Sequence, residues 1–178
     1  MRFTRHRKGT LRAELEEVEV QILTQLAEEI LSLVEQPDVS DDPLAALIGL
    51  PTGDVDPPDN PVLSRLLPDA YPDDREAAGE FRRYTDADLR ATKRADAQVV
   101  LATLPDGSGR LELDRNQADR WLGALNDMRL ALGTSLEVTE ASDPEDYDED
   151  DPRRQSLAIY GWLGYLQESL LSCLDPRQ

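Results

Sequence analysis

The chain has 178 residues, with 37 acidic against 19 basic side chains and a formal net charge of −18. One cysteine and one histidine exclude a disulfide framework, a zinc finger and a His-based metal cluster, and they argue against a Ser-His-Asp triad. No apolar run is long enough to span a membrane, and no apolar stretch of the signal-peptide kind follows the basic N-terminus. We therefore expect a cytoplasmic protein.

Leucine dominates the apolar residues, with 28 Leu against 13 Val plus Ile. Unbranched Leu loses little rotamer freedom in a helix, so this bias favours helices. The length fits one domain with a real core. We predict a single, mainly α domain over residues 1–178, with about five longer helices, a proline-rich crossing loop and a two-stranded β ribbon.

The first third of the chain contains a tail, a short strand and a long helix. Residues 1–8 form a basic tail, and the alternation of Leu11, Ala13 and Leu15 with polar residues is a weak strand signal. Two adjacent apolar stripes between residues 16 and 36 predict a heavily buried helix that ends before Pro37.

Residues 37–72 contain eight of the twelve prolines and are predicted to form a crossing segment. Two short apolar pieces, 44–50 and 62–67, follow Asp42-Pro43 and Asn60-Pro61. An Asx cap followed by Pro is a good helix start, so each piece is predicted to form a helix of one or two turns.

Two helices are predicted between residues 74 and 104, the first over 74–84 and the second from a capping-box-like Thr85 to Asp88. A turn over 105–109 then leads into a strand over 110–113. This strand resembles the first one, because each follows a glycine and feeds a long helix. The two strands could pair with each other, or the likeness could be chance between Leu-rich segments.

The last part of the chain contains two further helices around an acidic loop. Asp114 is predicted to cap a helix that runs to Leu132 and is stopped by Gly133. Residues 140–152 are predicted to be a loop, because eight acids lie between Glu140 and Asp151. The final helix is predicted over 153–174.

No catalytic, cofactor-binding or metal-ligating set is assigned from the residues, and we expect no cofactor. The acidic loop lacks the glycine and the spacing of a calcium loop, so a solvated loop is favoured over a contact for a basic partner. The basic residues cluster at 2–12 and 82–94 and could contact phosphates, contact an acidic partner or pair with nearby carboxylates. At a net charge of −18 we do not expect direct DNA binding.

Two further features leave alternatives open. Cys173 continues the apolar stripe of the last helix, which favours a buried, inert thiol, although an exposed redox-active thiol is the other interpretation. In the last helix, Gly161 and Gly164 flank aromatic residues, an arrangement that permits close helix packing, either in the core or in a homodimer. The candidate dimer interface is Gly161, Trp162, Gly164 and Tyr165.

Four segments, residues 80–85, 88–93, 121–133 and 160–170, resemble in order and spacing an actinobacterial domain-of-unknown-function family. That family includes the oxidative-stress transcriptional regulator AosR. The third segment is the most specific, since its Asn126-Asp127-x-Arg129-Leu-Ala-Leu-Gly133 run is not explained by amphipathicity alone.

The resemblance implies a non-enzymatic regulatory module that contacts a sigma factor or an RNA polymerase subunit. A disulfide within a Cys-x-x-x-Cys motif is the redox switch that the family implies, and this chain departs from it because Cys173 stands alone. Association of the family with the Clp adaptor ClpS implies an adaptor or structural homodimer as the alternative, and an enzyme of unknown class is a third.

Partner contacts are expected among polar residues of the matched segments. Asp127 and Arg129 could instead form a buried network that fixes helix packing. The candidates for partner contact are Arg82, Arg83, Arg90, Lys93, Asn126, Asp127 and Arg129.

Overall fold

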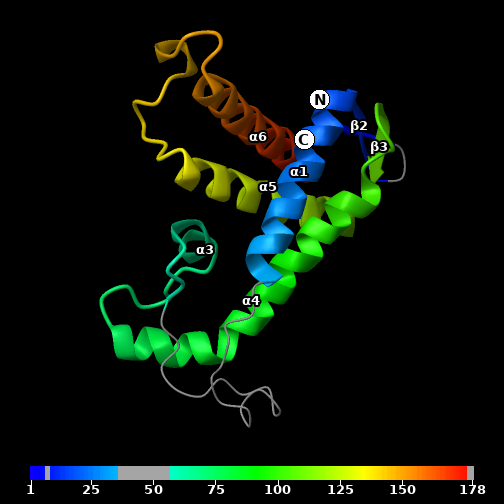
Figure 1. The fold of residues 1–178 in the computed structure, drawn as a ribbon. Helices are drawn as coiled ribbons and strands as arrows, with labels where there is room; N and C mark the ends of the chain where they lie inside the picture. Colours follow the sequence, from blue (N-terminus) through cyan, green and yellow to red (C-terminus); the bar gives the residue numbers. More distant parts are fainter. Residues whose placement is uncertain (7–8, 36–56, 176–178) are drawn as a thin grey trace.

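The computed structural model describes residues 1–6, 9–35 and 57–175, and the predicted mainly α fold is confirmed. The elements surround one leucine-rich core, and both chain ends lie near the small sheet (Figure 1). The short helix predicted over 44–50 lies outside the described residues. The helices are α1 (Glu17–Glu35), α3 (Pro61–Leu66), α4 (Arg75–Thr103), α5 (Arg115–Ser135) and α6 (Pro152–Leu174), with the 3-10 turn η2 (Pro144–Asp146).

A three-stranded antiparallel sheet closes one end of the helices. It is made of β1 (Thr4–Arg5), β2 (Leu11–Leu15) and β3 (Gly109–Leu113), with β2 in the middle. The proposed pairing of the two strands is confirmed, with Leu11 opposite Leu113. The third strand comes from the segment assigned to a basic tail, because Phe3 is buried there and draws the chain onto the core.

Helix α1 buries one of its two predicted apolar stripes more deeply than the other. Val20, Leu23, Ala27 and Val34 of one stripe are buried together with Ile30 of the other, and α1 packs mainly on α4. Val18, from the other stripe, is 53% exposed. The stripe that includes Leu23 is therefore the one that faces the core.

The predicted break between two helices at Thr85 is wrong, because α4 is continuous from Arg75 to Thr103. The Thr85 hydroxyl donates a hydrogen bond to the carbonyl of Phe81 at 3.0 Å instead of capping a new helix. Thr92 does the same to Asp88 at 2.9 Å. Such bonds to the preceding turn bend helices, and α4 changes direction along its length (Figure 1).

Helix α5 begins as predicted and ends later than predicted. Asp114 and Gln117 form a reciprocal capping box at its start. Gly133 does not stop the helix, which continues to Ser135, because this glycine has a packing role against α6. Trp121, on the same helix, is fully buried and donates from Nε1 to the Thr103 hydroxyl at 2.8 Å.

The short helix α3 confirms the prediction for residues 62–67 to within one residue. Asn60 caps it through its side chain, which accepts from the backbone of Val62 and Leu63, and Pro61 occupies the first turn. Leu63 and Leu66 bury α3 against α5. This contact brings Arg65 of α3 close to α5 and α6.

Candidate functional site

The run from Asn126 to Gly133, the most specific part of the family resemblance, divides between two faces of α5. Asn126, Arg129, Leu130 and Gly133 recur at the spacing of one helical face and line a groove of about 550 Å³. Asp127 and Met128 point the other way and are buried. Helix α3 contributes Arg65 to the groove, α6 contributes Tyr160 and α5 also contributes Thr134. The segment just past α5 contributes Glu137 and Val138.

Arg129 is held at the groove by contacts with two side chains of α6. Its guanidinium carbon lies 5.1 Å from the centre of the Tyr160 ring, in cation–π contact. Its Nη1 lies 3.5 Å from Oε1 of Gln167, at the limit of a hydrogen bond. The Gln167 amide in turn donates from Nε2 to Oδ1 of Asn126 at 3.4 Å. Gln167 therefore links the two polar groove residues of α5 to α6.

Of the two glycines beside this arrangement, one makes room for it. A Cβ on Gly133 would lie 2.9 Å from Cε2 of Tyr160, closer than real side chains approach. A Cβ on Gly164 would lie 3.5 Å from Nε of Arg129, an ordinary contact. Gly133 is thus required for the position of the Tyr160 ring, whereas Gly164 is not required for that of Arg129.

The inward face of the run forms an ion pair with α4. Nζ of Lys93 donates to Oδ1 of Asp127 at 2.7 Å, and both residues are buried. Burial raises the pKa of the Asp127 carboxyl, with Lys93 acting in the opposite direction. Nearby, Arg120 donates to Oδ1 of Asp96 at 2.9 Å. This pair joins α4 to α5 as well, so both ion pairs lie between the same two helices.

The basic residues of α4 lie mostly against the protein itself. Arg82 is buried and donates to the carbonyl of Leu67 at 3.2 Å and to Oδ1 of Asp69 at 2.6 Å. Arg90 is also buried and donates from Nε to Asp86. Arg83 lies half-buried beside Arg82. Arg82 therefore joins α4 to the segment after α3, and its role as a partner contact stays a prediction.

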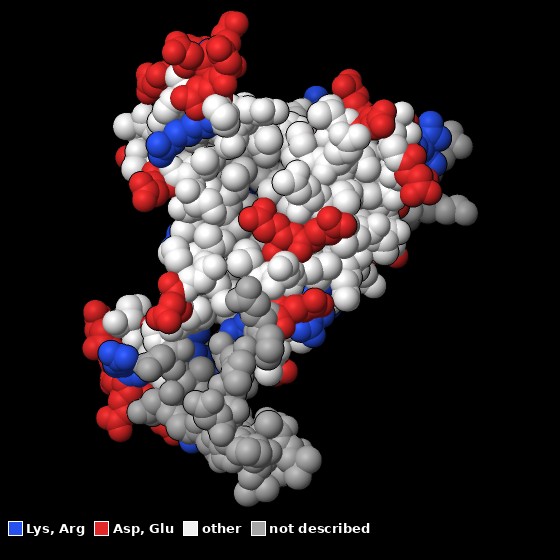
Figure 2. Space-filling model, viewed as in Figure 1, with Lys and Arg blue, Asp and Glu red and all other residues white. Residues whose placement is uncertain are grey.

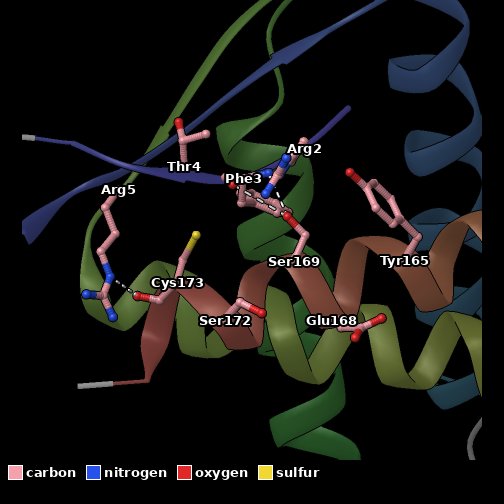
Figure 3. Close-up of a pocket in the computed structure, with 9 residues that line it drawn as sticks. All are labelled: Arg2, Phe3, Thr4, Arg5, Tyr165, Glu168, Ser169, Ser172 and Cys173. Atoms are coloured by element: carbon pink, nitrogen blue, oxygen red, sulfur yellow. Dashed lines mark hydrogen bonds between the residues drawn. The ribbon is translucent and has the colours of Figure 1, made fainter. Parts of the chain in front are cut away.

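A second cavity, of about 710 Å³, lies between β1 and α6 (Figure 3). Arg2, Phe3, Thr4 and Arg5 line one wall, and α6 supplies the other wall. Cys173 is half-buried here, so its exposure falls between the buried thiol and the exposed thiol that the sequence left open. The Nε of Arg5 donates to the Cys173 carbonyl at 2.8 Å. The α6 residues at this wall are Tyr165, Glu168, Ser169, Ser172 and Cys173.

The four residues predicted for a dimer interface do not share one face of α6. Gly161 is exposed with open space around it, and Tyr165 is 48% exposed. Trp162 packs on the core, and Gly164 faces Arg129. A dimer contact therefore stays a prediction for Gly161 and Tyr165, while the other two residues have contacts within the chain.

The surface carries acidic side chains over several elements. Figure 2 shows them gathered at the connection between α5 and α6, at the top of the view, where the acidic loop lies. Among the described residues, no group of three His, Cys, Asp or Glu side chains is placed to hold a metal ion. None of the described helices combines the length and the apolarity that a membrane span requires.

Several residues at or beside the groove were not predicted as site residues from the sequence, among them Tyr160, Gln167 and Arg65. Tyr160 and Gln167 lie inside a matched segment, but amphipathic patterning does not distinguish them from core residues or surface residues. Arg65 lies outside the matched segments. Only the packing of α3 on α5 brings Arg65 to the groove, so no local signal could have identified it.

Comparison with known proteins finds a family of unknown function and relatives that are named as regulators. The model of the domain of unknown function DUF2017 matches residues 1–174. The oxidative stress regulator AosR of Mycobacterium tuberculosis is 37% identical over an alignment that covers 92% of this chain and 81% of that protein. The protein of the same name from Mycobacterium bovis gives the same values. No solved structure matches. The chain belongs to the DUF2017 family.

Proposed function

We propose that the chain is a regulatory protein-interaction module of the oxidative-stress response, and that it acts in the cytoplasm on transcription by contacting a sigma factor or an RNA polymerase subunit. The relatives at 37% identity carry the name of an oxidative stress regulator, which supports the regulatory class. On this proposal the chain does not act as an enzyme.

The observation that carries the proposal is the division of the run from Asn126 to Gly133. Its inward half forms the Lys93–Asp127 pair that joins two helices, a structural role. Its outward half lines an open groove beside Arg65 and Tyr160. Polar side chains at a groove between packed helices are suited to recognising a macromolecular partner.

The residues proposed for partner contact can be ranked by their surroundings. Asn126 and Arg129 line the groove, and Arg83 is half-buried on α4. Arg82, Arg90, Lys93 and Asp127 are buried and form bonds within the chain. We therefore expect the first group to affect binding directly, and the second group to act through the stability of the scaffold.

The test is direct binding between the purified full chain and purified sigma factors or RNA polymerase core from the same host. We expect one of these proteins to bind with a dissociation constant that rises in Asn126→Ala and Arg129→Gln variants. Arg2→Gln, which removes an equal charge at the other cavity, is the matched control. Absence of binding to every sigma factor and to the core enzyme, in reducing and in oxidising buffer, would refute the proposal.

A further inference from the structure

The groove between α3, α5 and α6 is locally basic in a strongly acidic chain. Two arginines, Arg65 and Arg129, line it against one acid, Glu137, whereas the whole chain has a net charge of −18. Glu137 lies in the turn past the end of α5, whereas Arg129 lies within the helix. The end of the groove near Arg129 is therefore the end that favours a negatively charged group.

Arg129 is fixed in position while its hydrogen-bonding capacity is poorly satisfied. A guanidinium has five N–H donors. Within the described part of the chain, its hydrogen bond to Gln167 is long, at 3.5 Å, and its buried Nε has no partner. The Tyr160 ring holds the group without using its donors. A positioned guanidinium at a groove, with donors beyond those used within the chain, suits a ligand that accepts hydrogen bonds.

Asn126 lies on the same side of the groove. Its Oδ1 accepts from Gln167, and its side-chain hydrogen bond to the Asp127 carboxyl acts to lower the pKa of that group. Leu130 and Val138 supply apolar surface beside these polar groups. A planar carboxylate on a short side chain matches the Arg129 guanidinium, because the fork of arginine binds a carboxylate through two parallel bonds.

We propose that this groove binds an acidic peptide segment of a protein partner, and that the guanidinium of Arg129 receives the carboxylate of an Asp or Glu side chain. This inference rests on the proposed function only in taking the partner to be a protein. A polyanion such as a nucleic acid fits less well, because the net charge of −18 repels it outside the groove. The acidic loop of a second copy is a competing occupant.

The test uses a library of random displayed peptides, selected on the immobilised full chain. We expect the selected peptides to share an Asp or Glu. Their affinity is expected to fall roughly tenfold to a hundredfold in Arg129→Gln, as for loss of a charge-assisted hydrogen bond. The affinity of the Arg129→Lys variant is expected to lie between those of the wild type and Arg129→Gln. The ammonium keeps the charge but cannot form two parallel bonds to a carboxylate. Arg2→Gln is the control and should bind as the wild type does.

A second variant keeps the test valid if Arg129→Gln does not fold. Asn126 is exposed, so Asn126→Asp should leave the fold intact and place a like charge beside the bound carboxylate. We expect Asn126→Asp to weaken the same peptides, and more at low salt than at high salt. Replacing the Asp or Glu of a selected peptide by its amide should abolish most of its binding to the wild type and change little in the Arg129→Gln variant.

Several results would overturn the inference. These are selected peptides without a shared acid, equal affinity for the Arg129→Gln chain, or preference for a phosphorylated peptide over its Asp or Glu form. Self-association that disappears when the acids of residues 145–151 are changed to amides, with no external peptide bound, would assign the groove to a second copy. If acidic peptides bind but RNA polymerase and sigma factors do not, the proposed function is refuted and the inference about the groove stands.

Discussion

The ring of Phe3 stands edge-on to the indole of Trp121, with centroids 5.9 Å apart and planes at 77°. Both side chains are buried. Phe3 lies just before β1, and Trp121 lies on α5. The backbone N–H of Phe3 also donates to the hydroxyl of Ser169 on α6 at 3.0 Å. The first residues of the chain are therefore part of the core.

Replacing Phe3 by Ala is expected to lower the free energy of unfolding by about 3 kcal/mol, since it removes a buried ring and leaves a cavity beside Trp121. Urea denaturation followed by tryptophan fluorescence would measure this. Arg2→Ala, at the neighbouring exposed position, should change stability by no more than about 0.5 kcal/mol. Equal effects of the two variants would show that the N-terminal segment does not pack as described.

Replacing Lys93 by Met should destabilise the fold by about 3 kcal/mol near neutral pH, because it leaves the buried Asp127 carboxylate without its counter-ion. Burial already raises the pKa of Asp127, and loss of Lys93 should raise it further. The folded variant then holds the Asp127 proton more tightly than the unfolded chain does. The stabilising contribution of this group is thus fully present below the ordinary Asp value of 3.8 and is lost as pH rises through the folded pKa.

The measurement is chemical denaturation of wild type and Lys93→Met at several pH values. The difference in their free energies of unfolding should widen as pH rises from about 4 to 7. A double variant, Lys93→Met with Asp127→Leu, should regain much of the lost stability, because no unpaired charge remains. A pH-independent difference would contradict the ion pair.

Replacing Arg82 by Ala is expected to cost about 2 to 3 kcal/mol, because it removes two hydrogen bonds that join α4 to the segment after α3 and leaves the Leu67 carbonyl without this donor. Hydrogen exchange should show faster exchange in α3. Arg83→Ala is the adjacent control and is expected to leave exchange in α3 unchanged. The same exchange rates in both variants would refute this role of Arg82.

Replacing Gly133 by Ala tests the packing of α5 on α6. The added methyl would meet the rigid Tyr160 ring at 2.9 Å, a strain of about 1 to 3 kcal/mol that the better helix propensity of Ala offsets by about 1 kcal/mol. We expect a modest net loss of stability and a displaced Tyr160. Gly161→Ala, where the Cβ meets open space, should be neutral or stabilising. Thermal unfolding of both variants would check this.

Replacing Cys173 by Ser should cost no more than about 1 kcal/mol, because the side chain is half-buried at the edge of a cavity and a hydroxyl there can reach solvent. A thiol reagent should label the native protein measurably, and more slowly than the urea-unfolded chain. Labelling only after global unfolding would show that the thiol is fully buried.

Local patterns predicted most of the helices and strands of this protein. The leucine bias and the apolar stripe through Leu23 predict α1, and the Asx-Pro start at Asn60 predicts α3. Both depend on neighbours in the sequence, where propensity and capping act. The pattern at Thr85 wrongly predicted the start of a new helix, because a threonine hydroxyl can either cap a helix or bond back to the preceding turn. Only the continuity of α4 decides between these two roles.

The sequence by itself determined the helical class, the acidic surface and the absence of a second cysteine for a disulfide. Only the tertiary structure decided which half of the run from Asn126 to Gly133 faces the groove and which forms the ion pair with Lys93. It also brought Arg65 and Tyr160 together across three helices. The physical reason is that helical periodicity gives the faces of one helix, whereas the partner of each face depends on how distant segments pack.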